Sequence, residues 1–195
     1  VHTAVIICLA GGILITVFGI LFSHNILALM NTKDELIDGA VLYLRIYLLG
    51  MPALGLYNFG NAVLSAAGDT KRPLYYLAFA GVVNVILNLF FVIVCHLGVA
   101  GVALASMISQ LISAFLILRA LLTGKEKYCL RLSEIRFDKR KAVGILQIGI
   151  PSAFQYSLFA FANLFVQSSV NSFDHVLVEG NSAAANADPL VYDMM

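Results

Sequence analysis

The sequence predicts an all-α integral membrane protein with about five complete membrane-spanning helices and the start of a sixth. Hydrophobic residues make up 61% of the 195 residues and charged residues only 12%. A soluble domain carries about 25% charged residues. The chain also holds five apolar runs that are long enough to cross a bilayer, which takes about 20 residues of helix. Composition and run length together therefore place the chain in the membrane.

Polar turns separate the predicted spans and fix their order. The five apolar runs cover residues 4–22, 39–67, 74–95, 99–122 and 143–173. A polar loop at 25–38, a basic turn at 68–73, a short turn at 96–98 and a basic linker at 123–141 connect them in that order. A sixth helix is expected to start near Asn181. Since both ends of the sequence fall close to apolar or helical stretches, we expect the chain to be a piece of a longer protein.

Lysine and arginine gather in alternate connections. The turn at 68–73 and the linker at 123–141 hold nine of these residues, whereas the loop at 25–38 holds only Lys33 and the turn at 96–98 holds none. Lys and Arg mark the cytoplasmic side of a membrane protein. We therefore expect the two basic connections to be cytoplasmic and the protein to lie in the cell (plasma or inner) membrane.

Polar side chains recur along one face of the third and fourth spans. Asn84 and Asn88 are four residues apart, which places both on one side of a helix. The fourth span carries Ser106, Ser109, Gln110 and Ser113. These groups either hydrogen-bond across the antiparallel helix pair or line a cavity that binds a cation or a substrate. The sequence leaves both interpretations open.

Prolines and amides mark two other spans. Pro52 lies within the second span and Pro151 near the start of the fifth, where each is either a static kink or a hinge that moves during gating. Gln155 and Asn163 follow Pro151 on the fifth span. With Gln110, they are candidates for residues that line a cavity.

Several classes of function are excluded by what the sequence lacks. A net charge of +1 argues against a nucleic-acid partner, and the three cysteines and four histidines show no metal-ligand spacing. No phosphate-binding loop or nucleophile motif is present, so we expect no enzyme and no cofactor. The predicted spans contain no Asp or Glu, apart from Asp193 near the last residue. Ion-coupled transporters use intramembrane carboxylates, so a coupling carboxylate is expected mainly outside this chain.

Several motifs resemble those of the MATE family, the multidrug and toxic compound extrusion transporters. They are the Gly68–Pro73 turn, the Asn84 and Asn88 pair, the Gly98–Ala105 stretch, the Leu42–Tyr47 stretch with Gly50 and Pro52, and the Asn171–Phe173 stretch followed by Gly180–Asn186. The resemblance covers nearly the whole chain and is strongest to the bacterial branch related to DNA-damage-inducible F.

The resemblance implies a twelve-helix, two-lobed transporter, of which this chain is an incomplete part. Residues 1–122 would be helices 3–6 of the first lobe, 123–142 the interlobe linker, and 143–195 helix 7 with the start of helix 8. The implied activity is export of cationic, amphipathic compounds by alternating access, in exchange for sodium or protons.

The family's first-lobe cation site falls on Asn84, Asn88 and Ser106 by resemblance. Some members have Asp at the second of these positions, and Asn88 cannot titrate as that carboxylate would. Two alternatives remain beside the antiporter: a flippase for lipid-linked saccharides with a similar two-lobed architecture, and a membrane scaffold that transports nothing. A scaffold predicts that every polar group between the third and fourth spans is paired. The chain by itself is not expected to transport, because the remaining helices would be missing.

Overall fold

The structure is a computed structural model that describes residues 1–29, 34–123, 130 and 136–170. Its helices are α1 (His2–Leu29), α2 (Asp34–Leu49), α3 (Met51–Ala66), α4 (Lys71–Leu89), α5 (Gly98–Thr123) and α6 (Lys139–Val170), with a π-helical segment, η1 (Phe90–Val94), directly after α4. Four spans qualify by length and hydropathy, and the bent pair α2–α3 makes a fifth. The five predicted complete spans are therefore confirmed, whereas the predicted sixth helix lies outside the described residues.

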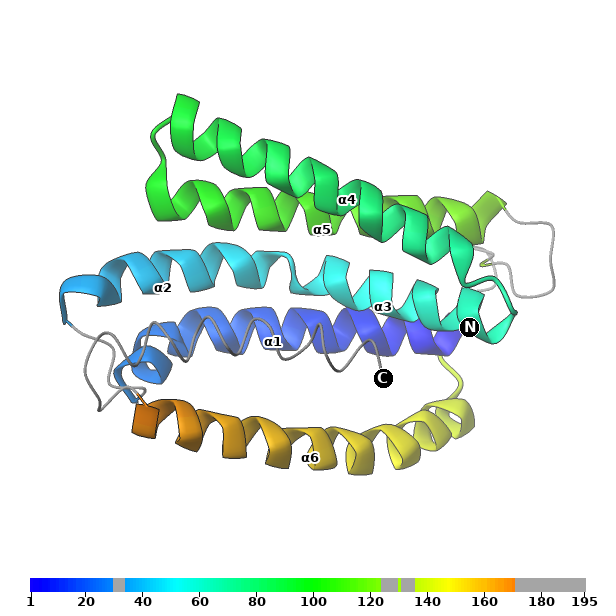
Figure 1. Cartoon of the computed structure of the whole chain (residues 1–195). Helices are drawn as coiled ribbons and strands as arrows, with labels where there is room; N and C mark the ends of the chain where they lie inside the picture. Colours follow the sequence, from blue (N-terminus) through cyan, green and yellow to red (C-terminus); the bar gives the residue numbers. More distant parts are fainter. Residues whose placement is uncertain (30–33, 124–129, 131–135, 171–195) are drawn as a thin grey trace. The chain divides into compact units, whose positions relative to one another are not determined.

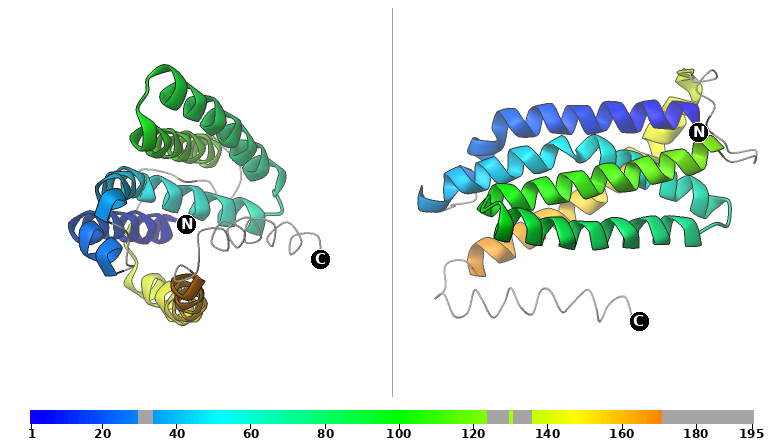
Figure 2. Two further views of the ribbon diagram at one scale, coloured as in Figure 1. Left: turned by 60° about the vertical axis from the view of Figure 1, so that its left-hand side comes forward. Right: turned by 90° about the horizontal axis from the view of Figure 1, so that it is seen from above.

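The helices divide into two compact units, and the boundary falls within α6, between Ile145 and Leu146. Within the first unit, α1 packs on α2 and α3, both of these pack on α5, and α5 packs on α4 (Figure 1). The two views of Figure 2 show α4 and α5 side by side. The first unit is thus a layered helical bundle with α5 between the bent pair α2–α3 and α4.

The second predicted span is not one continuous helix. It is broken at Gly50 into α2 and α3, and the two halves meet at an angle of 45°. Pro52 lies at the second position of α3, where a missing N–H is tolerated. Because Pro52 cannot donate to the carbonyl four residues earlier, the α-helical ladder lacks a hydrogen bond at this point. The structure thus replaces the predicted mid-helix kink with a full break.

The turn at 96–98 makes α4 and α5 antiparallel neighbours, as predicted. His96 and Gly98 both have a positive φ of 53°, a backbone region that glycine adopts freely. A Cβ added at Gly101 would lie 2.9 Å from Phe91 Cβ. The small residues at the start of α5 therefore allow the two helices to approach closely.

Helix boundaries differ from the prediction at two connections. The predicted loop at 25–38 is wrong over most of its length, because α1 continues to Leu29 and α2 begins at Asp34. At the other connection, α6 begins at Lys139 because Asp138 Oδ1 accepts hydrogen bonds from the Arg140 and Lys141 amides, at 3.0 and 3.3 Å.

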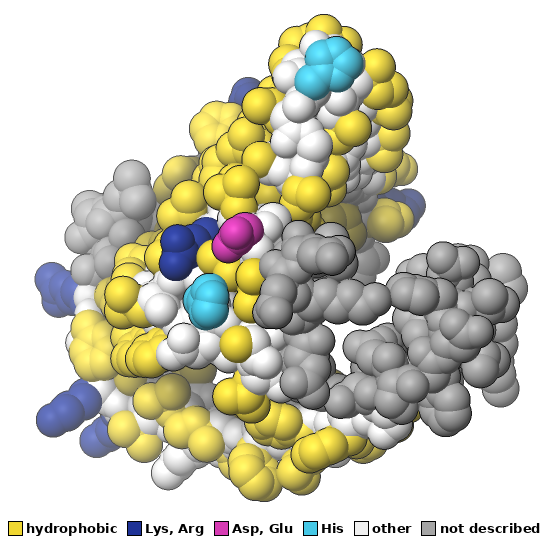
Figure 3. All heavy atoms as spheres, turned by 90° about the vertical axis from the view of Figure 1, so that its left-hand side faces the viewer, with side chains coloured by type: hydrophobic (Ala, Val, Ile, Leu, Met, Phe, Trp, Pro, Cys, Tyr) yellow, Lys and Arg dark blue, Asp and Glu magenta, His cyan; other side chains and the backbone are white. Residues whose placement is uncertain are grey.

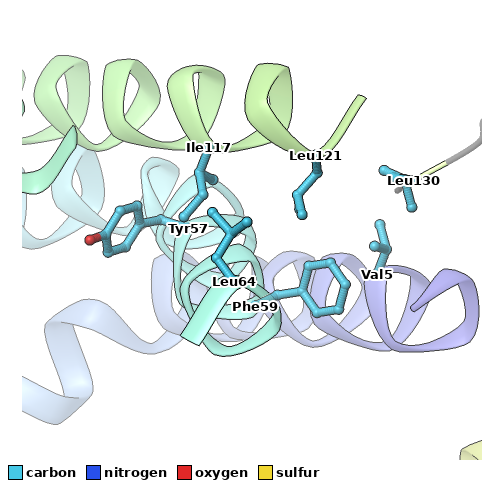
Figure 4. Close-up of a cluster of buried hydrophobic side chains, with 7 residues drawn as sticks. All are labelled: Val5, Tyr57, Phe59, Leu64, Ile117, Leu121 and Leu130. Carbon is cyan, nitrogen blue, oxygen red and sulfur yellow. The ribbon is translucent and has the colours of Figure 1, made fainter. Parts of the chain in front are cut away.

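A buried apolar cluster joins three helices of the first unit to the linker. Its members come from α1, α3, α5 and residue 130, and are Val5, Tyr57, Phe59, Leu64, Ile117, Leu121 and Leu130 (Figure 4). Leu130 N also donates to Leu121 O at 3.0 Å. The cluster therefore fixes one point of the linker on the first unit.

The outer surfaces of the helices are mainly apolar, as a lipid environment requires. Many large apolar side chains of α1 and α4 are more than half exposed, including Leu21 on α1 and Leu74 on α4. Hydrophobic side chains cover most of the described surface in the view of Figure 3. Together with the spans, this surface makes the chain a multi-pass membrane protein.

Candidate functional site

A chain of hydrogen bonds crosses from α4 to α5. Asn88 Nδ2 donates to Asn84 Oδ1 at 3.0 Å, and Asn84 Nδ2 donates to Ser109 Oγ at 3.0 Å. Ser109 Oγ in turn donates to Ala105 O at 2.7 Å and Ser106 O at 3.0 Å. The predicted Asn84 and Asn88 pair thus lies on one face of α4 and meets the polar face of α5.

One end of this chain is open. Asn88 Oδ1 is buried and has no hydrogen-bond partner among the described residues. A buried acceptor without a donor costs about 1–3 kcal/mol. The arrangement therefore offers a buried oxygen to a ligand that carries positive charge or an N–H or O–H group.

Ser106 contributes its backbone carbonyl to this hydrogen-bond chain, and its role as a cation-binding hydroxyl remains a prediction. Its carbonyl accepts from Ser109, whereas the hydroxyl that meets Asn84 belongs to Ser109. Ser109 is only 7% exposed. The sequence placed Ser109 on the same polar face as Ser106, so the α5 periodicity indicated the face, and only the helix register in the structure distinguishes the two hydroxyls.

Gln110 faces the break between α2 and α3. A Cβ added at Gly50 would collide with Gln110 Oε1, so glycine leaves the room that this amide occupies. Gln110 Oε1 is a second buried oxygen that lacks a partner in the described part of the chain. The structure thus places the cavity-lining candidate Gln110 against the α2–α3 break, whereas Asn84 and Asn88 lie on α4.

A threonine on helix α1 hydrogen-bonds to the backbone at the break between α2 and α3. Thr16 Oγ1 donates to Leu48 O at 2.7 Å and to Gly12 O at 2.9 Å. Leu48 is the residue whose carbonyl the Pro52 amide would serve in an unbroken helix, because helical N–H groups bond four residues back. Thr16 therefore supplies the donor that Pro52 lacks. This hydrogen bond from α1 stabilises the break between α2 and α3 at the hinge candidate Pro52.

The candidates on α6 lie in the second compact unit. Pro151 is inside α6, and Gln155 and Asn163 are exposed on it. Their predicted roles as hinge and cavity-lining residues remain predictions. In the described part of α4 and α5 no Asp or Glu occurs. Nowhere among the described residues do three His, Cys, Asp or Glu side chains gather as a metal site would require.

Comparison with known proteins points to one family. The family model MatE matches residues 1–90. Probable multidrug resistance protein YpnP of Bacillus subtilis (strain 168) is 33% identical over 174 residues, which are 89% of this chain and 38% of that protein. The chain therefore spans well under half the length of this curated relative.

Solved structures share the fold. A MOP superfamily transporter from Pyrococcus furiosus matches with a TM-score of 0.83 and 23% identity, over 97% of this chain and 43% of that one. A MATE crystallised in the bent conformation matches with a TM-score of 0.80 and 23% identity, over 95% and 42%. The helical arrangement is thus that of part of such a transporter.

Proposed function

Because the chain belongs to the MATE family, we propose that it forms part of a secondary active antiporter that exports cationic, amphipathic small molecules from the cell. Uptake of sodium or protons would drive export, and the two lobes would expose the binding cleft alternately to each side. Pro52 and Pro151 are the proposed flex points. The basic connections at 68–73 and 123–141 would face the cytoplasm. The curated relative named as a multidrug resistance protein supports export of foreign compounds.

The observation that carries this proposal is the open end of the α4–α5 hydrogen-bond chain. Asn88 Oδ1 is a buried acceptor with no donor among the described residues. Polar groups inside a membrane protein that lack an internal partner favour a role along a substrate or ion pathway. Asn84, Asn88 and the Ser106 hydroxyl are therefore proposed to contact the transported cation or the coupling ion.

The two alternatives are less well supported. A scaffold predicts full pairing between the third and fourth spans, but Asn88 Oδ1 and Gln110 Oε1 lack partners among the described residues. A lipid-linked saccharide flippase would favour a basic cavity, and the polar contacts of α4 with α5 involve amides and hydroxyls. Both observations favour the antiporter.

Efflux of ethidium tests the proposal. The complete reading frame that contains this chain would be expressed in cells lacking other drug pumps, and efflux measured with and without sodium and at two external pH values. We expect Asn84→Ala and Asn88→Ala to lower efflux at least tenfold, while Asn25→Ala, at an exposed position near the end of α1, leaves it unchanged. Normal efflux by both α4 variants would contradict a role for these amides.

A further inference from the structure

In the α4–α5 hydrogen-bond chain each side chain donates to the next, from Asn88 through Asn84 to Ser109. The hydroxyl of Ser109 determines this order of donors and acceptors. A serine hydroxyl has one proton and two acceptor lone pairs. The Ser109 proton faces Ala105 O at 2.7 Å and Ser106 O at 3.0 Å. Both are backbone carbonyls of the preceding turn of α5, which can only accept. The proton of Ser109 is therefore committed to its own helix.

This commitment leaves Ser109 Oγ only as an acceptor toward α4. The group that approaches it must donate, and Asn84 Nδ2 does so at 3.0 Å. In the opposite orientation Asn84 Oδ1 would face Ser109 Oγ, and Ser109, which is 7% exposed, could pair with it only by giving up its 2.7 Å bond to Ala105 O. Unpaired buried polar groups are costly, so Ser109 fixes which end of the Asn84 amide faces α5.

The orientation passes along α4. With Nδ2 turned to Ser109, Asn84 presents Oδ1 to Asn88, and Asn88 meets it with Nδ2 at 3.0 Å. Asn88 therefore turns its own Oδ1 to the free end of the chain, where it is buried and unpartnered. An amide carries donors and acceptors equally, so nothing in Asn88 itself makes the free end an acceptor.

We propose that Ser109 is a positioning residue that sets the polarity of this site, so that its buried open end presents oxygen to cations and excludes anions. This inference rests on the proposed function, and it adds the role of Ser109. Because the α5 backbone carbonyls hold the Ser109 proton, a site made only of neutral groups prefers cations. The ligand is a positively charged group, either an alkali cation or the ammonium-like part of an organic cation.

The first test is of the hydrogen bond, and it needs no transport. The full 195-residue chain, labelled with 15N-asparagine, would be studied by NMR in detergent micelles. We expect the Asn84 side-chain NH2 protons to exchange slowly with solvent, and to exchange at least tenfold faster in Ser109→Ala. The control is Ser113→Ala, one turn further along α5, because Ser113 is 4% exposed and donates to Gln110 O at 2.9 Å but makes no side-chain bond to α4 among the described residues.

The second test is of ligand preference. The Asn88 side-chain signals would be followed while sodium replaces choline at constant chloride, and separately while ethidium is added, which distinguishes an alkali cation from an organic one. We expect at least one of the two ligands to shift these signals, Ser109→Ala to weaken that response at least tenfold, and Ser113→Ala to leave it as in the unsubstituted chain. Iodide in place of chloride should cause no shift.

A rescue separates polarity from structural damage. Asn88→Asp in the Ser109→Ala background restores an end that only accepts, since an ionised carboxylate has no donor, and should recover the cation response. If Ser109→Ala does not fold, Ser109→Cys replaces it, because sulfur fills the space and is a weak acceptor. Any of four results would overturn the proposal. The cation response could be the same in Ser109→Ala and the unsubstituted chain, or fall equally in Ser109→Ala and Ser113→Ala. Neither cation could cause a response, or Asn88→Asp could fail to restore it. If the NMR results are as expected but the full protein does not export ethidium, only the proposed transport function is overturned.

Discussion

At the scale of single residues, two adjacent glycines on α1 show how closely the α2–α3 break is held. A Cβ on Gly12 would lie 2.7 Å from Pro52 Cα and 3.1 Å from Pro52 N, whereas a Cβ on Gly11 would meet nothing within 4 Å. Backbone atoms cannot rotate away as the end of a side chain can. The position of Pro52 is therefore set as much by the absence of a side chain on α1 as by the proline itself.

Gly12→Ala should separate α1 from the break and lower the free energy of unfolding by about 1–3 kcal/mol, the usual cost of overpacking. Gly11→Ala is the matched control, and it should be neutral or stabilising by about 0.5–1 kcal/mol because alanine favours a helix interior. Reversible unfolding in mixed detergent micelles, followed by circular dichroism, measures both. Equal stability of the two variants would show that α1 does not hold the break.

At the scale of helices, the α2–α3 break depends on a hydroxyl from a third helix. Thr16→Val keeps the shape of the side chain and removes the donor to Leu48 O. Intramembrane hydrogen bonds of this kind contribute about 0.6–1.7 kcal/mol, so we expect a loss of stability in that range. Thr16→Ser retains the hydroxyl and should lose less. Spin-label distances across the break would report whether the 45° bend relaxes in the valine variant; unchanged stability and bend in both variants would contradict the assignment.

The sequence predicted the spans well because a bilayer demands long apolar runs, and such runs are visible in one dimension. It also predicted the face that carries Asn84, Asn88 and the α5 hydroxyls, because helical periodicity is local. It did not predict that Ser109 rather than Ser106 meets Asn84, since that depends on the register of α4 against α5. Nor did it predict that Pro52 would produce a complete break, because the donor that stabilises Leu48 O comes from Thr16 on another helix.

At the scale of the whole molecule, the linker between α5 and α6 is attached to the first unit at two places. Thr3, only 5% exposed, donates from Oγ1 to Arg136 O at 3.2 Å and accepts from Asp138 N at 3.3 Å. Leu130 is buried in the apolar cluster. These contacts agree with a boundary between the two units that falls inside α6, after Ile145, rather than at the end of α5.

Leu130→Ala and Thr3→Val should therefore release the linker and speed trypsin cleavage within residues 123–141, by about tenfold for Leu130→Ala, since truncating a buried leucine costs about 2–5 kcal/mol. Phe137→Ala is the control, because Phe137 is 59% exposed. The fragments would be followed by mass spectrometry under native conditions. Cleavage at the same rate in all three variants would mean that the two attachments do not hold the linker.

The orientation of the molecule follows from the same arrangement. The contacts of Thr3 place the start of α1 and residues 136–138 together, and Tyr57 OH donates to Pro73 O at 3.0 Å near the 68–73 turn. The bundle in Figure 1 has the connection from α3 to α4 and the end of α5 at one end, and the turn from α4 to α5 at the other. Basic residues at the first end should hold it in the cytoplasm.

Cysteine labelling with a membrane-impermeant maleimide decides this orientation. Cys95 is exposed directly after η1 and serves as a native probe, once Cys8→Ala and Cys129→Ser remove the other thiols. In intact cells without an outer membrane barrier, Cys95 should react from outside. A second chain with Cys95→Ala and Lys71→Cys should react only in inside-out vesicles, because Lys71 opens α4 at the basic end. Labelling of the Lys71→Cys chain from outside would reverse the assignment, because the basic end of the bundle would then face away from the cytoplasm.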